Sequence, residues 1–235
     1  MDKGLFLAIP TYTGQIHAET TRCVMEAMLD AIERRWRFEY RPYPGCPIIS
    51  RLRNTIVSDF LASDMTDLLF VDADVVWQPG AVGKLVGYPV DVVAGIYPHR
   101  TDPLSWPVRY LKDRPDLWAD PDTGLLEVDG VPGGFLRLTR VALEKMIAAY
   151  PELRYNDFGA ISGSAHALFD HALRDKEYYG EDYVFCDRWH DVGGKVWVDP
   201  NIAMRHIGYK TFSGTFGTWL KGREPIPVPT NAEAA

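Results

Sequence analysis

The amino-acid sequence predicts an α/β fold in which helices flank a mixed, mostly parallel sheet. Residues 5–9, 68–71 and 92–97 are continuous apolar runs without polar alternation. Such runs are typical of strands that are buried on both faces of a parallel sheet. Segments with helical spacing of apolar residues lie between them. Strands that alternate with helices in this way indicate a parallel layer with right-handed crossovers.

The composition favours one soluble domain. The chain has 235 residues, of which 46% are hydrophobic, and this is enough for one sizeable core over residues 1–224. The formal charge of −7 argues against nucleic acid as a partner, although a small anionic ligand needs only a local basic pocket. The three cysteines are far apart, and no apolar run reaches membrane-spanning length. We therefore expect a cytoplasmic protein without a membrane span, and homo-oligomerisation stays open.

Strands and helices alternate through the first hundred residues. The strand at residues 5–9 ends in a loop at 10–14, and the next helix places Val24, Met28, Ala31 and Ile32 on its core face. Further strands are expected at residues 38–42, 68–71 and 92–97. Helices are expected at residues 51–62, with Ser50 as the N-cap, and at residues 81–87.

The pattern changes near residue 98, where turn residues become frequent. Strand candidates at residues 108–110 and 125–128 alternate as half-exposed antiparallel strands do, and another follows at 135–138. Thr139 is expected to cap a helix. Residues 151–180 are expected to be a loop with one edge strand, followed by a helix that begins at Glu181 and a strand at 196–198. Residues 225–235 contain three prolines and are expected to be a disordered tail.

Two aspartates, Asp72 and Asp74, follow the buried run at residues 68–71. Ligands of open α/β sheets collect outside the carboxyl ends of the strands. Two carboxylates at that position can hold Mg²⁺ or Mn²⁺, which prefer oxygen ligands and keep positions for water and phosphate. An isolated Asp-x-Asp is common, however, and it can also be a turn cap beside a solvated neighbour. The rest of the chain has to decide between these interpretations.

The residues Arg51, Arg53 and Asn54 crowd the first turn of a predicted helix. The helix dipole disfavours cations there, and an anion bound at the helix N-terminus would offset the cost. Ordinary surface arginines are the alternative. Thr11 and Tyr12 are expected to face the same crevice as Asp72, where a tyrosine could stack on a nucleobase or simply be a surface aromatic.

Three later features complete the pattern. Gly133 and Gly134 precede a strand, where glycines either let the backbone approach another group or serve a bulge. Glu181 and Asp182 open a helix, and the helix dipole alone would favour acids at that position. His206 follows a late apolar stretch and lies two positions before Gly208.

In this order and spacing, the sequence resembles glycosyltransferases of the GT-A fold, closest to the family 2-like members, over residues 4–210. The resemblance implies a metal-dependent transfer of sugar from a nucleotide-diphosphate donor, with UDP favoured, to an unidentified acceptor hydroxyl. Residues 1–97 would form the nucleotide-binding half, and residues 98–224 the acceptor-side half.

The resemblance also implies a role for individual residues. Asp74 and His206 would ligate Mn²⁺ or Mg²⁺, and Asp72 would lie near the metal or the ribose. Asp182, or with less support Glu181, would be the base that takes the acceptor proton, so that the anomeric centre inverts. Donor contacts would come from Pro10, Thr11, Tyr12, Arg51, Arg53, Asn54, Asp72, Ala73, Gly133 and Gly134.

Two other functions stay open. A sugar-nucleotidyltransferase would also use a metal held by carboxylates, but it usually has a glycine-rich basic loop after the first strand, and residues 10–14 contain no Lys or Arg. A non-catalytic nucleotide-sugar-binding module would not need the pair Glu181 and Asp182. Because the late motif lacks the Gln-x-x-Arg-Trp of processive synthases, a processive enzyme is disfavoured. Retaining enzymes share the Asp-x-Asp motif, so the stereochemistry is open.

Overall fold

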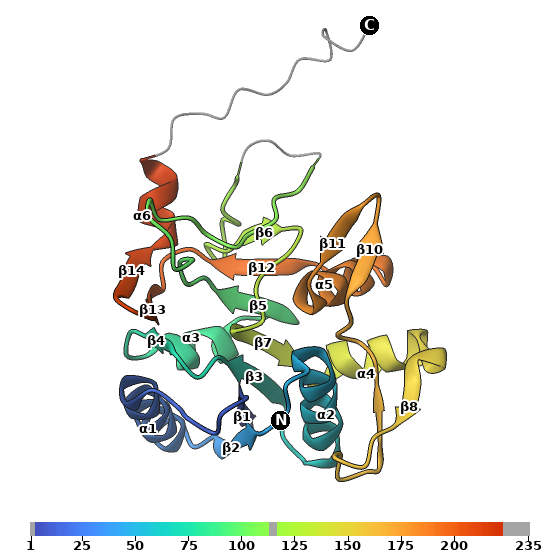
Figure 1. The fold of residues 1–235 in the computed structure, drawn as a ribbon. Helices are drawn as coiled ribbons and strands as arrows, with labels where there is room; N and C mark the ends of the chain where they lie inside the picture. The colour runs from blue at the N-terminus through green and yellow to red at the C-terminus, as the bar shows by residue number, and fades with distance from the viewer. Residues whose placement is uncertain (1–2, 113–116, 223–235) are drawn as a thin grey trace, which may run out of the picture.

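A seven-stranded mixed sheet forms the centre of the molecule (Figure 1). The computed structural model describes residues 3–112 and 117–222, so the predicted tail at 225–235 lies outside the described residues. Five strands of this sheet run in one direction, whereas β7 and β6 run against them. The predicted α/β architecture with a mixed, mostly parallel sheet is confirmed. In spatial order the strands are β2 (Arg37–Pro44), β1 (Gly4–Thr11), β3 (Asp67–Val71), β7 (Phe135–Thr139), β5 (Val92–Gly95), β12 (Val196–Asp199) and β6 (Leu126–Val128).

Helices cover both faces of this sheet and bury a separate core on each side. The apolar run in β1 is continuous because both faces of this strand are buried: Phe6 and Ala8 point into one core, while Leu5 and Leu7 point into the other. The first core packs against α2 (Ile49–Ala62), α4 (Arg140–Ala149), α5 (Glu181–Asp191) and α6 (Phe216–Lys221). The second packs against α1 (Ala18–Glu33) and α3 (Ala81–Gly87).

A second, three-stranded sheet brings residues 203–215 next to the segment that follows the carboxyl end of β3. Its strands are β14 (Thr211–Thr215), β13 (Ala203–Ile207) and β4 (Val75–Trp77). The sequence reasoning missed β4, which begins directly after the second aspartate of the Asp-x-Asp motif. In the β4–β13 ladder, His206 lies opposite Val75. The late histidine is therefore delivered to the carboxyl end of β3.

Several predicted details of the helices are wrong. Helix α2 begins at Ile49, with Ile48 rather than Ser50 at the N-cap and no side-chain cap, because the Ile48 carbonyl already accepts the Leu52 N–H. In α1, the expected core residues Met28 and Ile32 are 39% and 60% exposed. The other two expected core residues, Val24 and Ala31, are buried, and Thr20, Cys23 and Ala27 complete the buried stripe. By contrast, Thr139 does cap α4, since its side chain accepts from the Ala142 N–H.

The region from residue 151 to 180 is more regular than expected. It contains the 3₁₀ turn η1 (Pro151–Leu153) and two short hairpins in place of one edge strand. The hairpins are β8 (Arg154–Asn156) with β9 (Ser164–His166), and β10 (Ala172–Arg174) with β11 (Glu177–Tyr179). The expected strand at residues 108–110 is only an isolated bridge between Arg109 and Gly130.

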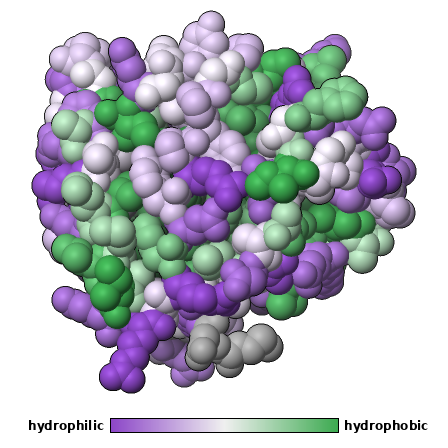
Figure 2. Space-filling model, turned by 90° about the horizontal axis from the view of Figure 1, so that it is seen from below, coloured by the Kyte–Doolittle hydropathy of each residue, from purple (hydrophilic) through white to green (hydrophobic). Residues whose placement is uncertain are grey.

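The surface has no continuous apolar face in the view of Figure 2, where apolar side chains form separate patches between polar ones. One exposed apolar group lies on the outer side of α1 and consists of Met25, Leu29 and Ile32. Among the described residues, none of the helices combines the length and the hydropathy that crossing a membrane requires.

Candidate active site

A cavity of about 840 Å³ opens at the carboxyl ends of β1 and β3, where α/β sheets usually bind ligands. The loop after β1, the Asp-x-Asp motif and the late histidine all contribute to its lining, through Pro10, Thr11, Tyr12, Asp72, Ala73, Asp74 and His206. The sequence reasoning missed other residues of its lining, among them Gln15, Ile16, His17, Ala18 and Arg100. We refer to this cavity as the cleft.

Asp74 and His206 face each other in the cleft because β4 and β13 pair. The Ile207 N–H donates to the Asp74 carbonyl (3.0 Å), which fixes the two segments side by side. His206 Nδ1 lies 2.9 Å from the Pro98 carbonyl oxygen, and because a carbonyl only accepts, Nδ1 carries a proton. In the neutral ring, Nε2 then presents a lone pair to Asp74 Oδ1 at 3.5 Å. Two facing acceptors are satisfied by a shared cation or by a second proton on the ring.

These two side chains fit a hard divalent cation. A separation of 3.5 Å allows both atoms to bind one ion at ordinary metal–ligand distances of about 2.1 Å. Within residues 3–112 and 117–222 there is no group of three His, Cys, Asp or Glu side chains that could hold a metal, so Asp72 does not complete a ready site with them. Mg²⁺ usually keeps waters and substrate phosphates among its ligands, and two protein ligands are therefore sufficient.

Arg100 is a cation that already contacts this pair. Its guanidinium forms an ion pair with Asp74 Oδ2, the oxygen that does not face His206. Partial burial opposes ionisation of Asp74, but a hydrogen bond from His206, which forms when the ring carries its second proton, and the charge of Arg100 outweigh it and lower the pKa of this carboxyl below its ordinary value. Asp74 is thus held in the charged form that a metal requires.

Asp72 points toward protein groups at the floor of the cleft. Its Oδ2 accepts a hydrogen bond from the Tyr97 hydroxyl (3.1 Å), and its Oδ1 lies 3.5 Å from Arg53 Nη2. The Asp72 N–H donates to the Gly134 carbonyl (2.9 Å), so the diglycine lies against the Asp-x-Asp motif. The structure therefore favours close backbone approach over a bulge as the role of these glycines.

Arg53 lies beneath the cleft rather than in its lining. Only 4% of the residue is exposed, and its guanidinium packs over the Phe70 ring. Nη1 donates to the Gly133 carbonyl (2.7 Å) and Nε donates to Glu181 Oε1 (3.1 Å). Together with the contact to Asp72, these bonds connect the Asp-x-Asp motif, the diglycine and the acidic start of α5 through one buried cation.

Replacing Gly134 with Ala should disrupt this junction. An added Cβ would overlap the Asp72 carboxylate and the Tyr97 hydroxyl, and overpacking of this kind costs about 1–3 kcal/mol. We expect a lower melting temperature. The matched control is Gly87→Ala at the exposed end of α3, where a Cβ meets nothing within 4 Å. If Gly134→Ala has the same melting temperature as Gly87→Ala, the close approach has no energetic importance.

Glu181 and Asp182 occupy the first turn of α5, where the helix dipole favours them. Glu181 is buried between Arg53 and His171, whose Nε2 lies 3.6 Å from Oε2. Asp182 Oδ2 accepts from the Gly133 N–H (3.2 Å). Burial, followed by the charge of Glu181, raises the pKa of Asp182 above its ordinary value, despite Arg53 and the backbone donors.

Arg51 and Asn54 are turned away from the cleft. Arg51 pairs with the buried Asp157 (2.8 Å), and the Asn54 amide both donates to and accepts from the Phe169 backbone, each at 2.8 Å. Asp157 supplies the negative charge that compensates Arg51, and Glu181 supplies it for Arg53. The arginines at the start of α2 are therefore compensated by carboxylates of the protein itself, and they do not require the bound anion that the sequence suggested.

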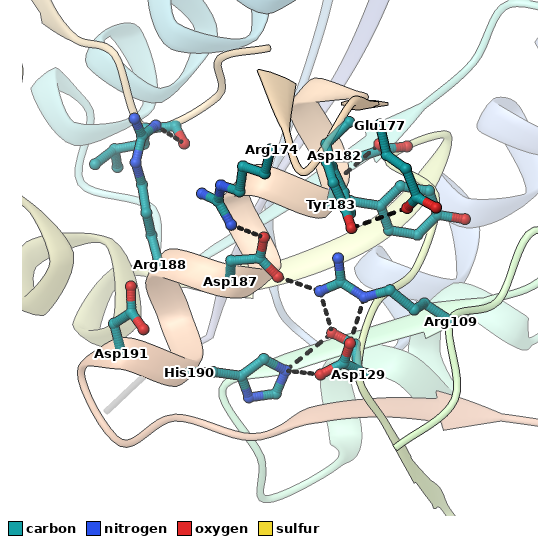
Figure 3. A network of polar contacts seen from close by, with 12 residues as sticks. Arg109, Asp129, Arg174, Glu177, Asp182, Tyr183, Asp187, Arg188, His190 and Asp191 are labelled. Atoms are coloured by element: carbon teal, nitrogen blue, oxygen red, sulfur yellow. Dashed lines mark hydrogen bonds and ion pairs between the residues drawn. The ribbon is translucent and has the colours of Figure 1, made fainter. Parts of the chain in front are cut away.

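A network of charged side chains holds the outer side of α5 (Figure 3). Asp187 lies between Arg174 (2.6 Å) and Arg109, and Arg109 also pairs with Asp129. His190 Nε2 lies 2.9 Å from the Asp129 carbonyl. These residues line a second cavity of about 620 Å³. Because their charges are paired with one another, we assign the network to positioning α5 and its acidic first turn.

The comparisons with known proteins bear on the fold. No family model and no curated protein matches this chain. Among solved structures, A197 from STIV matches with a TM-score of 0.54 and 18% identity, over 92% of this chain and 91% of that chain. A glycosyltransferase involved in the glycosylation of the major capsid of PBCV-1 is a remoter match, with a TM-score of 0.29, 12% identity and coverage of 66% and 72%. The chain thus shares the overall fold of A197, and this likeness shows the fold alone.

Proposed function

We propose that this protein is a metal-dependent glycosyltransferase that moves a sugar from a nucleotide-diphosphate sugar to an acceptor hydroxyl. The observation that carries the proposal is the pair Asp74 and His206, whose facing acceptor atoms lie in a cleft at the carboxyl end of the sheet. Mn²⁺ or Mg²⁺ bound by these two residues would supply positive charge that makes a glycosyl diphosphate a better leaving group. UDP is the nucleotide we favour.

The cleft also provides groups that suit a nucleotide. Tyr12 is 68% exposed at its edge and offers an aromatic face to a base. The start of α1 lines the cleft through its N-cap His17 and its first residue Ala18. A helix N-terminus carries partial positive charge, and this favours a diphosphate in the same cleft.

Asp182 is the better of the two candidate bases. Both oxygens of Glu181 face cations or potential cations, namely Arg53 and His171, whereas the oxygens of Asp182 accept from backbone N–H groups. A carboxylate whose pKa is raised toward the working pH is suited to take a proton from a hydroxyl. We therefore assign the proton transfer to Asp182 and expect inversion at the anomeric carbon.

The test is a thermal-shift panel of UDP-, GDP-, dTDP- and CDP-sugars with and without Mn²⁺. A donor at one hundred times its Kd should add about 2.7 kcal/mol of stability, and we expect this only when Mn²⁺ is present. Asp74→Asn and His206→Ala should remove the metal-dependent part. The control Asp64→Asn removes an exposed carboxylate that pairs with Arg37 at the surface, and it should behave like the parent.

The products of the reaction separate the competing functions. Release of free nucleoside diphosphate with transfer of the sugar supports a glycosyltransferase. Release of pyrophosphate from a nucleoside triphosphate and a sugar phosphate would indicate a nucleotidyltransferase instead. Donor binding without turnover would indicate a binding module, and metal-independent donor binding by Asp74→Asn at parental affinity would contradict the proposed metal site.

A further inference from the structure

Arg100 lies on the carboxylate that the proposed function assigns to the metal. It comes from the segment after β5, outside any strand or helix, and its side chain lines the cleft. The guanidinium pairs with Asp74 Oδ2, and both side chains are little more than one third exposed. A cation at this position is unexpected in a site for a second cation, because two positive charges on one carboxylate repel each other.

The position of Arg100 is fixed by its neighbours and is not that of a loose surface side chain. A Cβ on Gly208 would lie 2.9 Å from Arg100 Cδ, so the aliphatic part of the arginine packs where this glycine leaves room. The carbonyl of Pro98, two residues before Arg100, accepts a hydrogen bond from His206 Nδ1. Two residues after Arg100, Asp102 pairs with Lys210. The turn between β13 and β14 therefore holds the arginine against Asp74 from both sides.

One carboxylate charge cannot fully compensate two cations. The guanidinium lies on Asp74 Oδ2, whereas a metal between Asp74 and His206 would take Oδ1, so both would share the single negative charge of this side chain. A cation that enters between Asp74 and His206 therefore weakens the pair with Arg100 by drawing on the same charge and by repulsion. The freed guanidinium remains beside the cleft, and its planar fork matches two phosphate oxygens.

We propose that Arg100 is the internal counter-ion of Asp74, that a divalent cation displaces it, and that the displaced guanidinium then binds the diphosphate of the donor. This inference rests on the proposed function, because it uses the same metal pair. It adds that the metal and the diphosphate assist each other through Arg100: the metal frees the arginine, and the diphosphate holds it away from Asp74. By linkage, each ligand must tighten the binding of the other by the same factor.

The test is the variant Arg100→Met, measured with Mn²⁺ alone and then with UDP. Free Mn²⁺, counted by electron paramagnetic resonance without nucleotide, should show tighter binding than in the parent by on the order of fivefold or more, because no internal cation competes. The Kd for UDP at saturating Mn²⁺ should rise by on the order of tenfold to a hundredfold, because charge-assisted bonds to the phosphates are lost. A destabilised variant would weaken both affinities, so opposite shifts exclude misfolding.

Two further variants make the result specific. Arg37→Met removes a surface arginine at the amino end of β2, outside the lining of the cleft, and both affinities should stay parental. Arg100→Lys keeps the charge but loses the fork, so it should bind UDP less tightly than the parent and more tightly than Arg100→Met.

The outcomes separate this inference from the proposed function. If the parent binds Mn²⁺ and Arg100→Met binds it no more tightly, or if the UDP affinity is unchanged, the displacement is wrong while the metal site stands. If Arg37→Met shifts both affinities as strongly as Arg100→Met, the shifts come from the loss of one positive charge anywhere on the protein, and the displacement is again wrong. If the parent does not bind Mn²⁺, the proposed metal site and the displacement both fail.

Discussion

Replacing Asp182 with Asn should leave donor binding at the parental affinity and slow sugar transfer by about 10²–10⁴-fold, the usual cost of losing a general base. Asparagine has nearly the same shape, and its single amide oxygen can still accept from the Gly133 N–H, whereas the bond from the Tyr183 N–H is lost, so the melting temperature of the variant is measured alongside. The measurements are the donor Kd and the rate of nucleoside diphosphate release with acceptor. Asp191→Asn, at the exposed end of the same helix, is the control and should transfer sugar at the parental rate.

The pH profile gives a second readout of the same residue. The base must be deprotonated to act, so kcat/KM should fall as pH decreases through the raised pKa of Asp182. The negative charge of Glu181 contributes to that raised pKa. Glu181→Gln should therefore move the acid limb of the profile to lower pH, with a milder loss of rate than Asp182→Asn. Parental transfer by Asp182→Asn would refute the assigned base, and the anomeric configuration of the product would then be the next measurement.

Replacing Arg53 with Met should destabilise the fold by about 3–5 kcal/mol, the usual cost of breaking a buried ion pair by removing one partner. Methionine fills a similar apolar volume over Phe70, but it leaves the buried Glu181 carboxylate and the Gly133 carbonyl without their donor. Chemical denaturation at neutral pH measures the effect. Arg22→Met, which removes an exposed arginine from α1, should barely change the transition midpoint.

A double-mutant cycle identifies the cause. If the loss comes from the uncompensated carboxylate, Arg53→Met combined with Glu181→Gln should be less destabilised than the sum of the two single variants. Strict additivity would mean that Arg53 contributes through packing alone. If Arg53→Met is as stable as the parent, the contacts of Arg53 with Asp72 and Glu181 do not stabilise the fold.

The sequence could predict the strands of the large sheet because burial on both faces leaves a local pattern. The run at residues 68–71 is apolar at every position, and the structure buries it between two cores. The position of Asp72 and Asp74 follows from the end of that strand, and so does their place in the cleft. These features of the fold and the cleft depend only on residues that are neighbours in the chain.

The remaining parts depend on contacts between distant segments. The sequence shows an arginine at the start of α2, but not that its partner is Glu181, 128 positions later. Strand β4 is only three residues long and has no pattern of its own until β13 pairs with it. Arg100 lies in a segment without periodicity, and only the turn at Gly208 directs it toward Asp74. No local pattern could have identified it.

The pairing of β4 with β13 also has a consequence for the order of synthesis. The last strand of the large sheet ends at Asp199, whereas His206 and the rest of β13 come after it, 132 positions beyond Asp74. As the ribosome makes the chain from its N-terminus, every strand of the main sheet is present before the histidine emerges. The nascent chain can therefore assemble its framework while the cleft still lacks one of the two side chains that we propose as metal ligands, and the proposed site is completed only by the closing hairpin.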